Sequence, residues 1–171
     1  MIELSLSTMD MPLGRVLIAT KGRALCALDF EDFNAKTEAR LTRRFGAVSF
    51  IKDSDPLGIR ALLGAYLEGE IAAIDTLDVD PGGTPFQARV WAELRRIPAG
   101  RPCSYGDLAR AIGQPTAVRA VGGANGRNPI ALVIPCHRVI ASDGSLGGYS
   151  SGLERKRWLL QHEESADLTP R

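Results

Sequence analysis

A turn-forming segment near the middle of the chain, residues 80–83 (DPGG), divides the sequence into two parts. Proline restricts the backbone and glycine favours turns, so this run interrupts both helices and strands. The next residues have the composition of a helix start, with Thr84 as N-cap, Pro85 in the first turn and Gln87 as capping-box partner. We therefore predict a first domain over residues 1–80, a linker over 81–84 and a second domain over 85–171.

The two parts carry opposite net charge. Residues 1–84 contain 9 Lys and Arg against 13 Asp and Glu, a net charge of −4, whereas residues 85–171 contain 12 against 7, a net charge of +5. Such asymmetry is expected when one part of a protein meets a polyanion and the other stays clear of it. Chance scatter of surface charge is the alternative.

The first part has the pattern of a small α+β domain. Short apolar runs separated by turn residues predict an antiparallel meander over residues 2–7, 15–20 and 24–30. Helical spacing predicts helices over 38–45 and 57–67, and residues 71–79 fit another strand. The buried face of the second helix would be formed by Leu57, Leu62, Leu63 and Tyr66. Nothing in this part gathers nucleophiles, bases or metal ligands, and we assign Cys26 to the core.

The second part begins with three predicted helices. The first starts at Thr84, ends before residues 98–100 and turns Phe86, Val90, Trp91 and Leu94 inward. The second is capped by Ser104 with Asp107 and closes at Gly113, and the third runs over 117–125 with Thr116 as cap and Gly126 as end. Two short helices joined by a tight turn are typical of a helix-turn-helix, although an ordinary helical hairpin would have the same pattern.

The remainder of the second part has a β-like segment and a last helix. Residues 131–140 are β-like, residues 143–144 form a turn dipeptide, and residues 152–162 have helical spacing with Leu153, Trp158 and Leu159 facing inward. We expect the β-like segment to form a hairpin beside the two short helices, as a wing.

The cysteine count and the N-terminal residues indicate a reducing compartment. Three cysteines, Cys26, Cys103 and Cys136, show no paired spacing, which favours free thiols over a disulfide framework or a zinc cluster. The N-terminal residues lack the basic start and apolar segment of a signal peptide, and no run of eighteen apolar residues occurs. We expect a cytoplasmic protein that does not cross a membrane.

The residues most suggestive of chemistry are Cys136 and His137, which lie side by side in an apolar run after Pro135. A thiol is a good nucleophile only as the thiolate, and a neighbouring base eases its deprotonation. The ordinary alternative is that Cys136 is a small buried hydrophobe and that His137 lies on the surface of a strand.

This region resembles a known active-site signature. Residues 128–129 (NP) followed by residues 134–139 (IPCHRV) are similar to the signature of the bacterial O6-alkylguanine-DNA alkyltransferases, and the resemblance extends from Thr84 to Glu163. It implies an α+β protein with an N-terminal ribonuclease-H-like α/β domain and a C-terminal winged helix-turn-helix domain. It also implies a single-turnover DNA repair reaction in which an alkyl group of guanine moves irreversibly to the protein's own cysteine, without a cofactor. The N-terminal part lacks the clustered Cys and His that bind zinc in some relatives, so we expect no metal.

The resemblance assigns five catalytic residues. Cys136 matches the alkyl acceptor, and His137 matches the base that takes the thiol proton through a water molecule. Glu163 matches the carboxylate that orients this histidine, and Asn128 matches the side chain that ties the recognition segment to the active-site turn. Tyr105 matches the phenol that protonates the departing guanine. Without the resemblance, Glu163 would be interpreted as a solvated helix-end residue and Tyr105 as a half-buried aromatic.

Other positions match the residues that hold the substrate base. Tyr149 and Ser150 correspond to a loop that closes over the purine, and the backbone carbonyl of Val139 corresponds to the group that recognises the exocyclic amine of guanine. Tyr105 also belongs to this set. Ser151 stands where the family usually has glycine, which affects the shape of the loop. Cys103 is expected near the site.

The DNA-binding residues implied by the resemblance lie mostly on the predicted third helix. Since the lesion is inside the duplex, the nucleotide must be flipped out at a cost of a few kcal/mol, and Arg119 matches the finger that fills the gap. The small residues Ala117, Ala120 and Gly123 would let the helix approach the minor groove closely. Asn125 could contact a base edge. The expected phosphate contacts are Arg127 and Arg138.

The partner implied is double-stranded DNA containing O6-alkylguanine, with O4-alkylthymine as a further substrate, bound by a monomer that can act cooperatively. Other classes of function remain open. A winged-helix module could recognise alkylated DNA without repairing it, although such relatives lack the cysteine. A DNA-binding regulator could use Cys136 as a thiol sensor, and a thiol hydrolase would need an oxyanion-hole motif that the sequence does not show.

Overall fold

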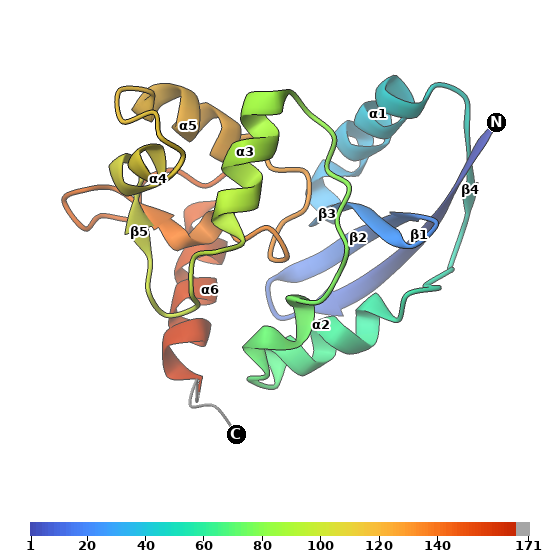
Figure 1. Cartoon of the computed structure of the whole chain (residues 1–171). Coiled ribbons are helices and arrows are strands. Elements are labelled where there is room, and N and C mark those ends of the chain that lie inside the picture. The colour runs from blue at the N-terminus through green and yellow to red at the C-terminus, as the bar shows by residue number, and fades with distance from the viewer. Residues whose placement is uncertain (167–171) are drawn as a thin grey trace.

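The computed structural model describes residues 1–166, so the last five residues of the predicted second domain lie outside the described part. The first part of the chain forms a four-stranded sheet (Figure 1) of order β3-β2-β1-β4. Its strands are β1 (Ile2–Met11), β2 (Gly14–Lys21), β3 (Ala24–Phe30) and β4 (Val48–Ile51). The antiparallel meander β1-β2-β3 is confirmed. β4 was not predicted; it is only four residues long and pairs parallel to β1.

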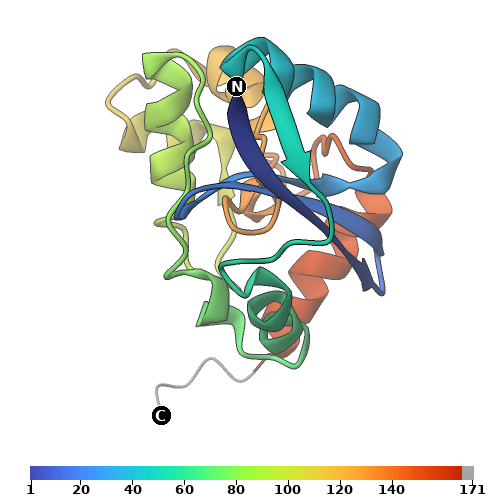
Figure 2. The same cartoon turned by 90° about the vertical axis from the view of Figure 1, so that its right-hand side faces the viewer.

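The two faces of this sheet are covered differently. Successive residues of a strand point to opposite faces, so Val16 and Ile18 of β2 join one apolar cluster whereas Leu17 and Ala19 join another. The helix α1 (Asn34–Phe45) contributes Leu41 to the second cluster. As Figure 2 shows, α1 lies above the sheet and the helix α2 (Ile59–Leu67) lies below it.

Two details of the first part differ from the sequence prediction. On α2, Leu63 and Tyr66 are buried as expected, together with Ile59, whereas Leu62 is only partly buried. Leu57 is also partly buried and lies before the helix, which begins at Ile59. The strand predicted over residues 71–79 is wrong: residues Ile71–Ile74 form the 3-10 helix η2, and only Val79 pairs with a strand residue. The two isoleucines, three positions apart, are both buried, which a helical turn permits and an extended strand does not.

The predicted helices of the second part are present. The helix α3 (Pro85–Leu94) has the complete Thr84–Gln87 capping box, and α4 (Tyr105–Ala111) has the same arrangement with Ser104 and Asp107. The next helix, α5 (Val118–Gly126), begins without a side-chain cap, so the expected role of Thr116 is wrong. The last helix is α6 (Leu153–Ser165), on which Leu159 is buried, whereas Leu153 is exposed rather than inward.

The hairpin expected over residues 131–140 is absent. Residues 131–134 make tight turns, residues Cys136–Arg138 form the 3-10 helix η3, and only β6 (Val139–Ile140) is extended. β6 pairs in parallel with β5 (Cys103–Ser104), an arrangement that a hairpin cannot produce. The segment is apolar because it is buried against the first part, where Ala131 N donates to Leu28 O at 2.8 Å.

The two parts share one apolar core. A single cluster of buried residues contains Phe30 and Leu63 from the first part and Trp91 and Val121 from the second. The indole of Trp91 also donates to Ala124 O at 2.8 Å, which joins α3 to α5. No helix among the described residues is long and apolar enough to span a bilayer.

Candidate active site

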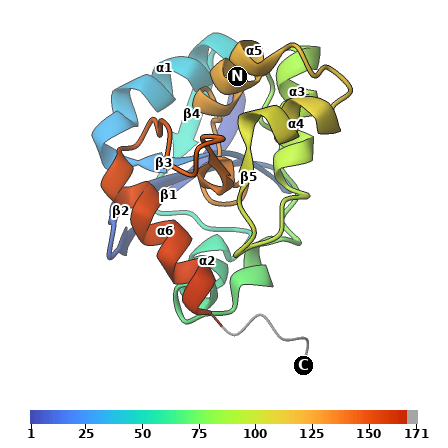
Figure 3. The same ribbon diagram turned by 90° about the vertical axis from the view of Figure 1, so that its left-hand side faces the viewer.

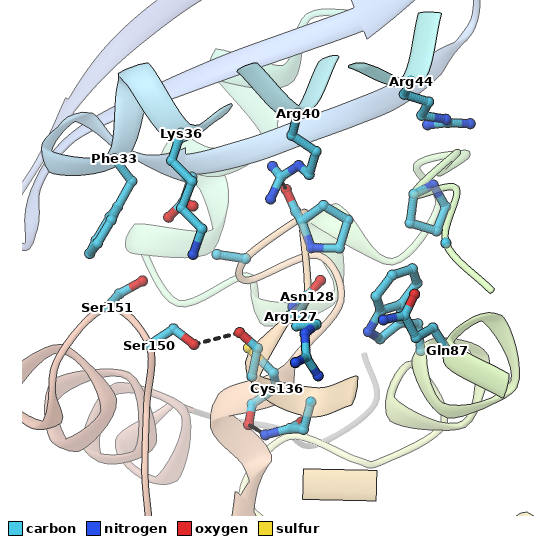
Figure 4. A pocket seen from close by; sticks show the side chains of 18 of the residues that line it. Phe33, Lys36, Arg40, Arg44, Gln87, Arg127, Asn128, Cys136, Ser150 and Ser151 are labelled. Carbon is cyan, nitrogen blue, oxygen red and sulfur yellow. Dashed lines mark hydrogen bonds between the residues drawn. The ribbon is translucent and has the colours of Figure 1, made fainter. Parts of the chain in front are cut away.

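Cys136 lies at the start of η3, where two cavities meet. It is 7% exposed and carries a free thiol. A small cavity of about 190 Å³ is lined by Cys136, Tyr105, Gly122, Asn125, Gly126 and residues 148–150. A large cavity of about 540 Å³ extends from Cys136 to the basic side chains of α1, and Figure 4 shows Lys36, Arg40 and Arg44 facing Cys136 and Arg127 across it. The thiol can therefore be reached without unfolding of the turn.

Burial keeps the thiol protonated at rest. Desolvation raises the pKa of Cys136 to about 11, although a hydrogen bond from Asn128 and the charge of Lys156 act in the opposite direction. A thiol with this pKa is almost wholly protonated at neutral pH. The site must therefore provide a base for any reaction in which Cys136 is the nucleophile.

His137, the next residue in the chain, has the chemistry of a base. Its side chain is completely buried, and Nε2 lies 2.7 Å from Oε1 of Glu163. Burial, together with the charges of Arg138 and Lys156, lowers the pKa of His137 despite the opposing effect of Glu163, so the ring is neutral at neutral pH. With the proton on Nε2, directed at the carboxylate, Nδ1 is the unprotonated acceptor, and it has no hydrogen-bond partner among the described residues.

Glu163 is the centre of a buried ionic cluster. Burial alone would raise its pKa, but hydrogen bonds from His137 and Arg138, together with the positive charge of Arg138, outweigh this and lower the pKa to about 2. Arg138 donates from Nε to Oε2 and from Nη2 to Oε1, both at 2.9 Å. Tyr66 donates its hydroxyl to Oε1 at 2.9 Å. The carboxylate thus remains ionised and fixed in orientation.

This cluster corrects the expected role of Arg138. Its side chain is buried, because Nη1 donates to Ile97 O at 2.8 Å and the other nitrogens hold Glu163. A guanidinium in this position cannot reach a phosphate on the surface. Asn125 is likewise buried, with Nδ2 donating to Cys136 O at 3.3 Å, so it is not available to a base edge.

Asn128 stabilises the turn before the cysteine. Its Nδ2 donates to Ile134 O at 2.7 Å and its Oδ1 accepts from Ile130 N at 3.0 Å. The turn includes Leu132 with a positive φ of 66°, which is strained for a residue with a branched side chain. Together Asn125 and Asn128 connect the end of α5 to the backbone that carries the thiol.

The walls of the small cavity hold the residues expected to contact a substrate. Tyr105 is half-buried, and its hydroxyl donates to Gly148 O at 3.5 Å. Ser150 donates to Gly126 O at 2.6 Å, which fixes the loop against α5. The ring of Tyr149 lines the cavity, and its hydroxyl is buried without a partner in the described residues.

The sequence analysis missed Lys156. This lysine is completely buried on α6, and its ammonium donates to Val139 O at 2.6 Å and to Gly148 O at 3.0 Å. Burial lowers its pKa to about 8. A signal was present in the sequence, since Lys156, Leu159 and Glu163 are spaced to lie on one face of the helix. A charged residue on an apolar stripe indicates a buried role.

The outer surface of α5 carries the expected DNA-binding residues. Arg119 and Ala120 are exposed, whereas Ala117 and Gly123 are half-buried. Arg127 is exposed just after the helix and also lines the large cavity. A Cβ on Gly123 would lie 3.1 Å from Nη1 of Arg127, so the small residue leaves room for this guanidinium.

Three further expectations concern Cys103, a metal site and Ser151. Cys103 is half-buried in β5 and pairs with Val139, which lies three positions after Cys136 in the sequence. Among residues 1–166, no group of three or more His, Cys, Asp and Glu side chains is arranged to hold a metal ion. Ser151 lines the large cavity, and its carbonyl accepts from Arg155 at 3.2 Å.

The fold and the site together define a class. A pair of short helices of the helix-turn-helix kind packs beside a buried thiol, which is supported by a histidine and an ionised carboxylate. This is a helix-turn-helix protein with a thiol, an imidazole and a carboxylate gathered in one site.

Comparison with known proteins identifies the family. Residues 4–81 match the family model described as "6-O-methylguanine DNA methyltransferase, ribonuclease-like domain". Residues 85–165 match the model described as "6-O-methylguanine DNA methyltransferase, DNA binding domain". The chain therefore belongs to the 6-O-methylguanine DNA methyltransferase family. The expected fold class, a ribonuclease-like domain followed by a DNA-binding domain in an α+β protein, is confirmed.

The relatives are similar over almost their whole length. The methylated-DNA–protein-cysteine methyltransferase of Salmonella typhimurium is 42% identical over 166 residues, which cover 95% of this chain and 97% of the relative. The Mycobacterium tuberculosis protein of the same name is 44% identical, with 95% of each chain covered. The crystal structure of the Mycobacterium tuberculosis O6-methylguanine methyltransferase superposes with a TM-score of 0.81 at 38% identity, covering 98% of this chain and 96% of that one.

A further solved structure contains DNA. The Mycobacterium tuberculosis OGT in complex with DNA superposes with a TM-score of 0.80 at 40% identity, and the match covers 94% of this chain and 93% of that chain.

Proposed function

We propose that this protein repairs double-stranded DNA by moving the alkyl group of an O6-alkylguanine irreversibly to Sγ of Cys136. The observation that carries this proposal is the position of Cys136, which lies in the wall of the small cavity with Tyr105 and is followed by the buried His137–Glu163 pair. Family membership supports the same reaction. Each molecule acts once, because a thioether does not release its alkyl group to water.

The proposed chemistry needs no cofactor. A water molecule carries the thiol proton to Nδ1 of His137, and the imidazolium is stabilised by Glu163. The bond from Sγ to the alkyl carbon forms as the bond from that carbon to O6 breaks. The electron pair stays on guanine, which takes a proton from the hydroxyl of Tyr105. Solvent then returns the proton held by His137 to Tyr105, so that only the thiol proton and the alkyl group have exchanged places.

The small cavity would receive the flipped base. Tyr149 and Ser150 form its outer wall, and the Val139 carbonyl can accept from the exocyclic amine of guanine with its second lone pair. Lys156 holds this carbonyl and Gly148 at a fixed separation. An O4-alkylthymine presents a similar leaving oxygen but lacks the amine, so it would react more slowly.

We assign DNA binding to the exposed surface of α5. Arg119 would enter the base stack in place of the flipped nucleotide, while Ala117, Ala120 and Gly123 allow close approach to the minor groove. Arg127 would contact a phosphate. With Asn125 and Arg138 buried, few side chains remain for base-edge contacts, so sequence preference beyond the lesion would be small.

We further propose a division of labour between two domains, residues 1–80 and 85–171, joined by the linker 81–84. The second would bind DNA and react, and the first would support it as a scaffold. A monomer contains all of the residues named above. The reducing cytoplasm would keep Cys136 as the free thiol that the reaction requires.

The experiment that tests this proposal is intact-mass analysis with peptide mapping. The protein is mixed with limiting and then excess duplex oligonucleotide that carries one O6-methylguanine. We expect one added methyl group per protein, located on Cys136, and no further transfer after saturation. The Cys136→Ala variant should bind the lesion without a change in mass. Tight binding by the unaltered protein with no added mass would instead indicate a recognition module.

A further inference from the structure

The active-site carboxylate is held from the first half of the chain as well as the second. Tyr66 lies near the end of α2 and is completely buried, and its hydroxyl donates to Oε1 of Glu163 at 2.9 Å. These residues are 97 positions apart in sequence. Figure 3 shows α2 directly beside the lower part of α6, which carries Glu163. The contact therefore links the two halves at the residue that orients His137.

Tyr66 is itself fixed by α6. Nε2 of His162 lies 2.7 Å from the Tyr66 carbonyl oxygen, and the two rings are 5.1 Å apart. Trp158 stacks on the other side of His162 at 4.8 Å. A phenol held by its backbone and its ring has little freedom to rotate, so the position of its hydroxyl is determined by the packing of α2 on α6.

The hydroxyl shares one oxygen with two other donors. Oε1 of Glu163 accepts from Tyr66, from Nε2 of His137 and from Nη2 of Arg138. Each donor partly neutralises the negative charge on this oxygen, and the effect is stronger in a buried site than in water. What remains on Oε1 determines how strongly the protonated form of His137 is stabilised.

We infer that Tyr66 is a positioning residue of the transfer reaction, whose hydroxyl orients Glu163 and limits how strongly Glu163 holds a proton on His137. The inference rests on the proposed function, because it assigns His137 the proton of Cys136. It gives the first half of the chain a part in the reaction beyond that of a scaffold, because the chemistry of the second half then depends on the Tyr66 hydroxyl.

The direction of the effect follows from the charges. Loss of the hydroxyl leaves more negative charge on Glu163, which raises the pKa of His137. Imidazolium cannot accept the thiol proton, so transfer would be lost at a higher pH than in the unaltered protein. The other ionisable groups facing this pair are Arg138, Lys156, His162 and Asp75, and all of them are retained when only the hydroxyl is removed.

The test is the Tyr66→Phe variant, which keeps the ring. Single-turnover transfer from duplex O6-methylguanine DNA is measured across the acid limb of the pH profile. We expect its midpoint to move upward by roughly half a unit to one unit, with lesion affinity unchanged. The ring protons of His137, followed by NMR without DNA, should titrate with the same upward shift. Thr20→Val is the matched control, since it removes a buried hydroxyl of the first half that has no partner in the described residues.

A double-mutant cycle tests whether the effect passes through Glu163. In a Glu163→Gln background, Tyr66→Phe should leave the titration of His137 unchanged. An equal shift in that background would overturn the inference. So would a uniform loss of rate with an unmoved midpoint, which indicates packing alone, or a shift of the same size in Thr20→Val. If the unaltered protein transfers no alkyl group, the proposed function fails, while the NMR titration still decides the role of Tyr66.

Discussion

The thiol of Cys136 combines two properties that oppose each other. It is buried, which raises its pKa to about 11, yet the proposed reaction requires the thiolate. Burial also excludes water that would compete for the alkyl group and strengthens the attraction between His137 and Glu163. Reactivity at neutral pH therefore depends on proton removal during the reaction and not on a thiolate present beforehand.

Replacing His137 by Gln should separate these two effects. Without the base, transfer near neutral pH should fall by about 10²- to 10⁴-fold. The rate should then rise steadily with pH, because ionisation of Cys136 toward its pKa of about 11 supplies the thiolate directly. Single-turnover rates over the alkaline range measure this. A flat profile for His137→Gln would contradict the assigned role.

Lys156 is the residue whose loss should distort the small cavity. Lys156→Met removes the ammonium that joins Val139 O to Gly148 O, so the buried Val139 carbonyl loses this donor and Gly148 O keeps the more distant hydroxyl of Tyr105. We expect a loss of about 2 kcal/mol in the free energy of unfolding and weaker lesion binding. Chemical denaturation and a binding titration measure the two effects. The neighbouring Arg157 is exposed, and Arg157→Met should change neither.

At the scale of elements, the contribution of side-chain capping to stability can be compared between the starts of α3 and α5. Thr84 caps α3 in the structure, whereas Thr116 makes no cap at α5 although its sequence position suggested one. Thr84→Ala should therefore lower the free energy of unfolding by about 1 kcal/mol, and Thr116→Ala should leave it nearly unchanged. Thermal or urea denaturation of the two variants gives the comparison. Equal losses would mean that α5 is capped by Thr116 in solution.

The role of α5 can be separated from the chemistry by a choice of substrate. Arg119→Ala should slow transfer from duplex DNA by about tenfold or more, since nothing then fills the gap left by the flipped base. Transfer from free O6-benzylguanine needs no flipping and should be unaffected. Both rates are measured on the same preparation, so each variant is its own control. An equal loss on both substrates would show that Arg119 does not act on the duplex.

At the scale of the whole molecule, the Glu163 cluster makes stability depend on acid. The pKa of Glu163 is lowered to about 2 from its ordinary value of 4.5, so its contribution is present above the unfolded-state pKa and is lost as pH falls toward 2. The shift corresponds to about 3 kcal/mol. Urea denaturation at successive pH values measures it. Glu163→Gln should remove most of this dependence and lower stability at neutral pH, because Arg138 is left buried without its partner, whereas Glu164→Gln should not.

Features that depend on near neighbours in the chain were determined by the sequence alone. The two capping boxes and the proximity of Cys136 to His137 involve residues only a few positions apart, and the antiparallel meander joins strands that are consecutive in the chain. Local backbone preferences and side-chain reach are sufficient for these. The division by charge at the central turn is likewise a property of composition.

The contacts between residues far apart in the sequence were decided only by the tertiary structure. Glu163 lies 26 positions from His137 and 97 from Tyr66, and no local pattern indicates that the three meet. The same limitation explains the error over residues 131–140, because an apolar run has the same appearance whether it is a strand or a turn buried against β3. Arg138 was assigned to the surface and Lys156 was missed, because charged side chains usually lie in solvent. Only the packing shows that each has a buried hydrogen-bond partner.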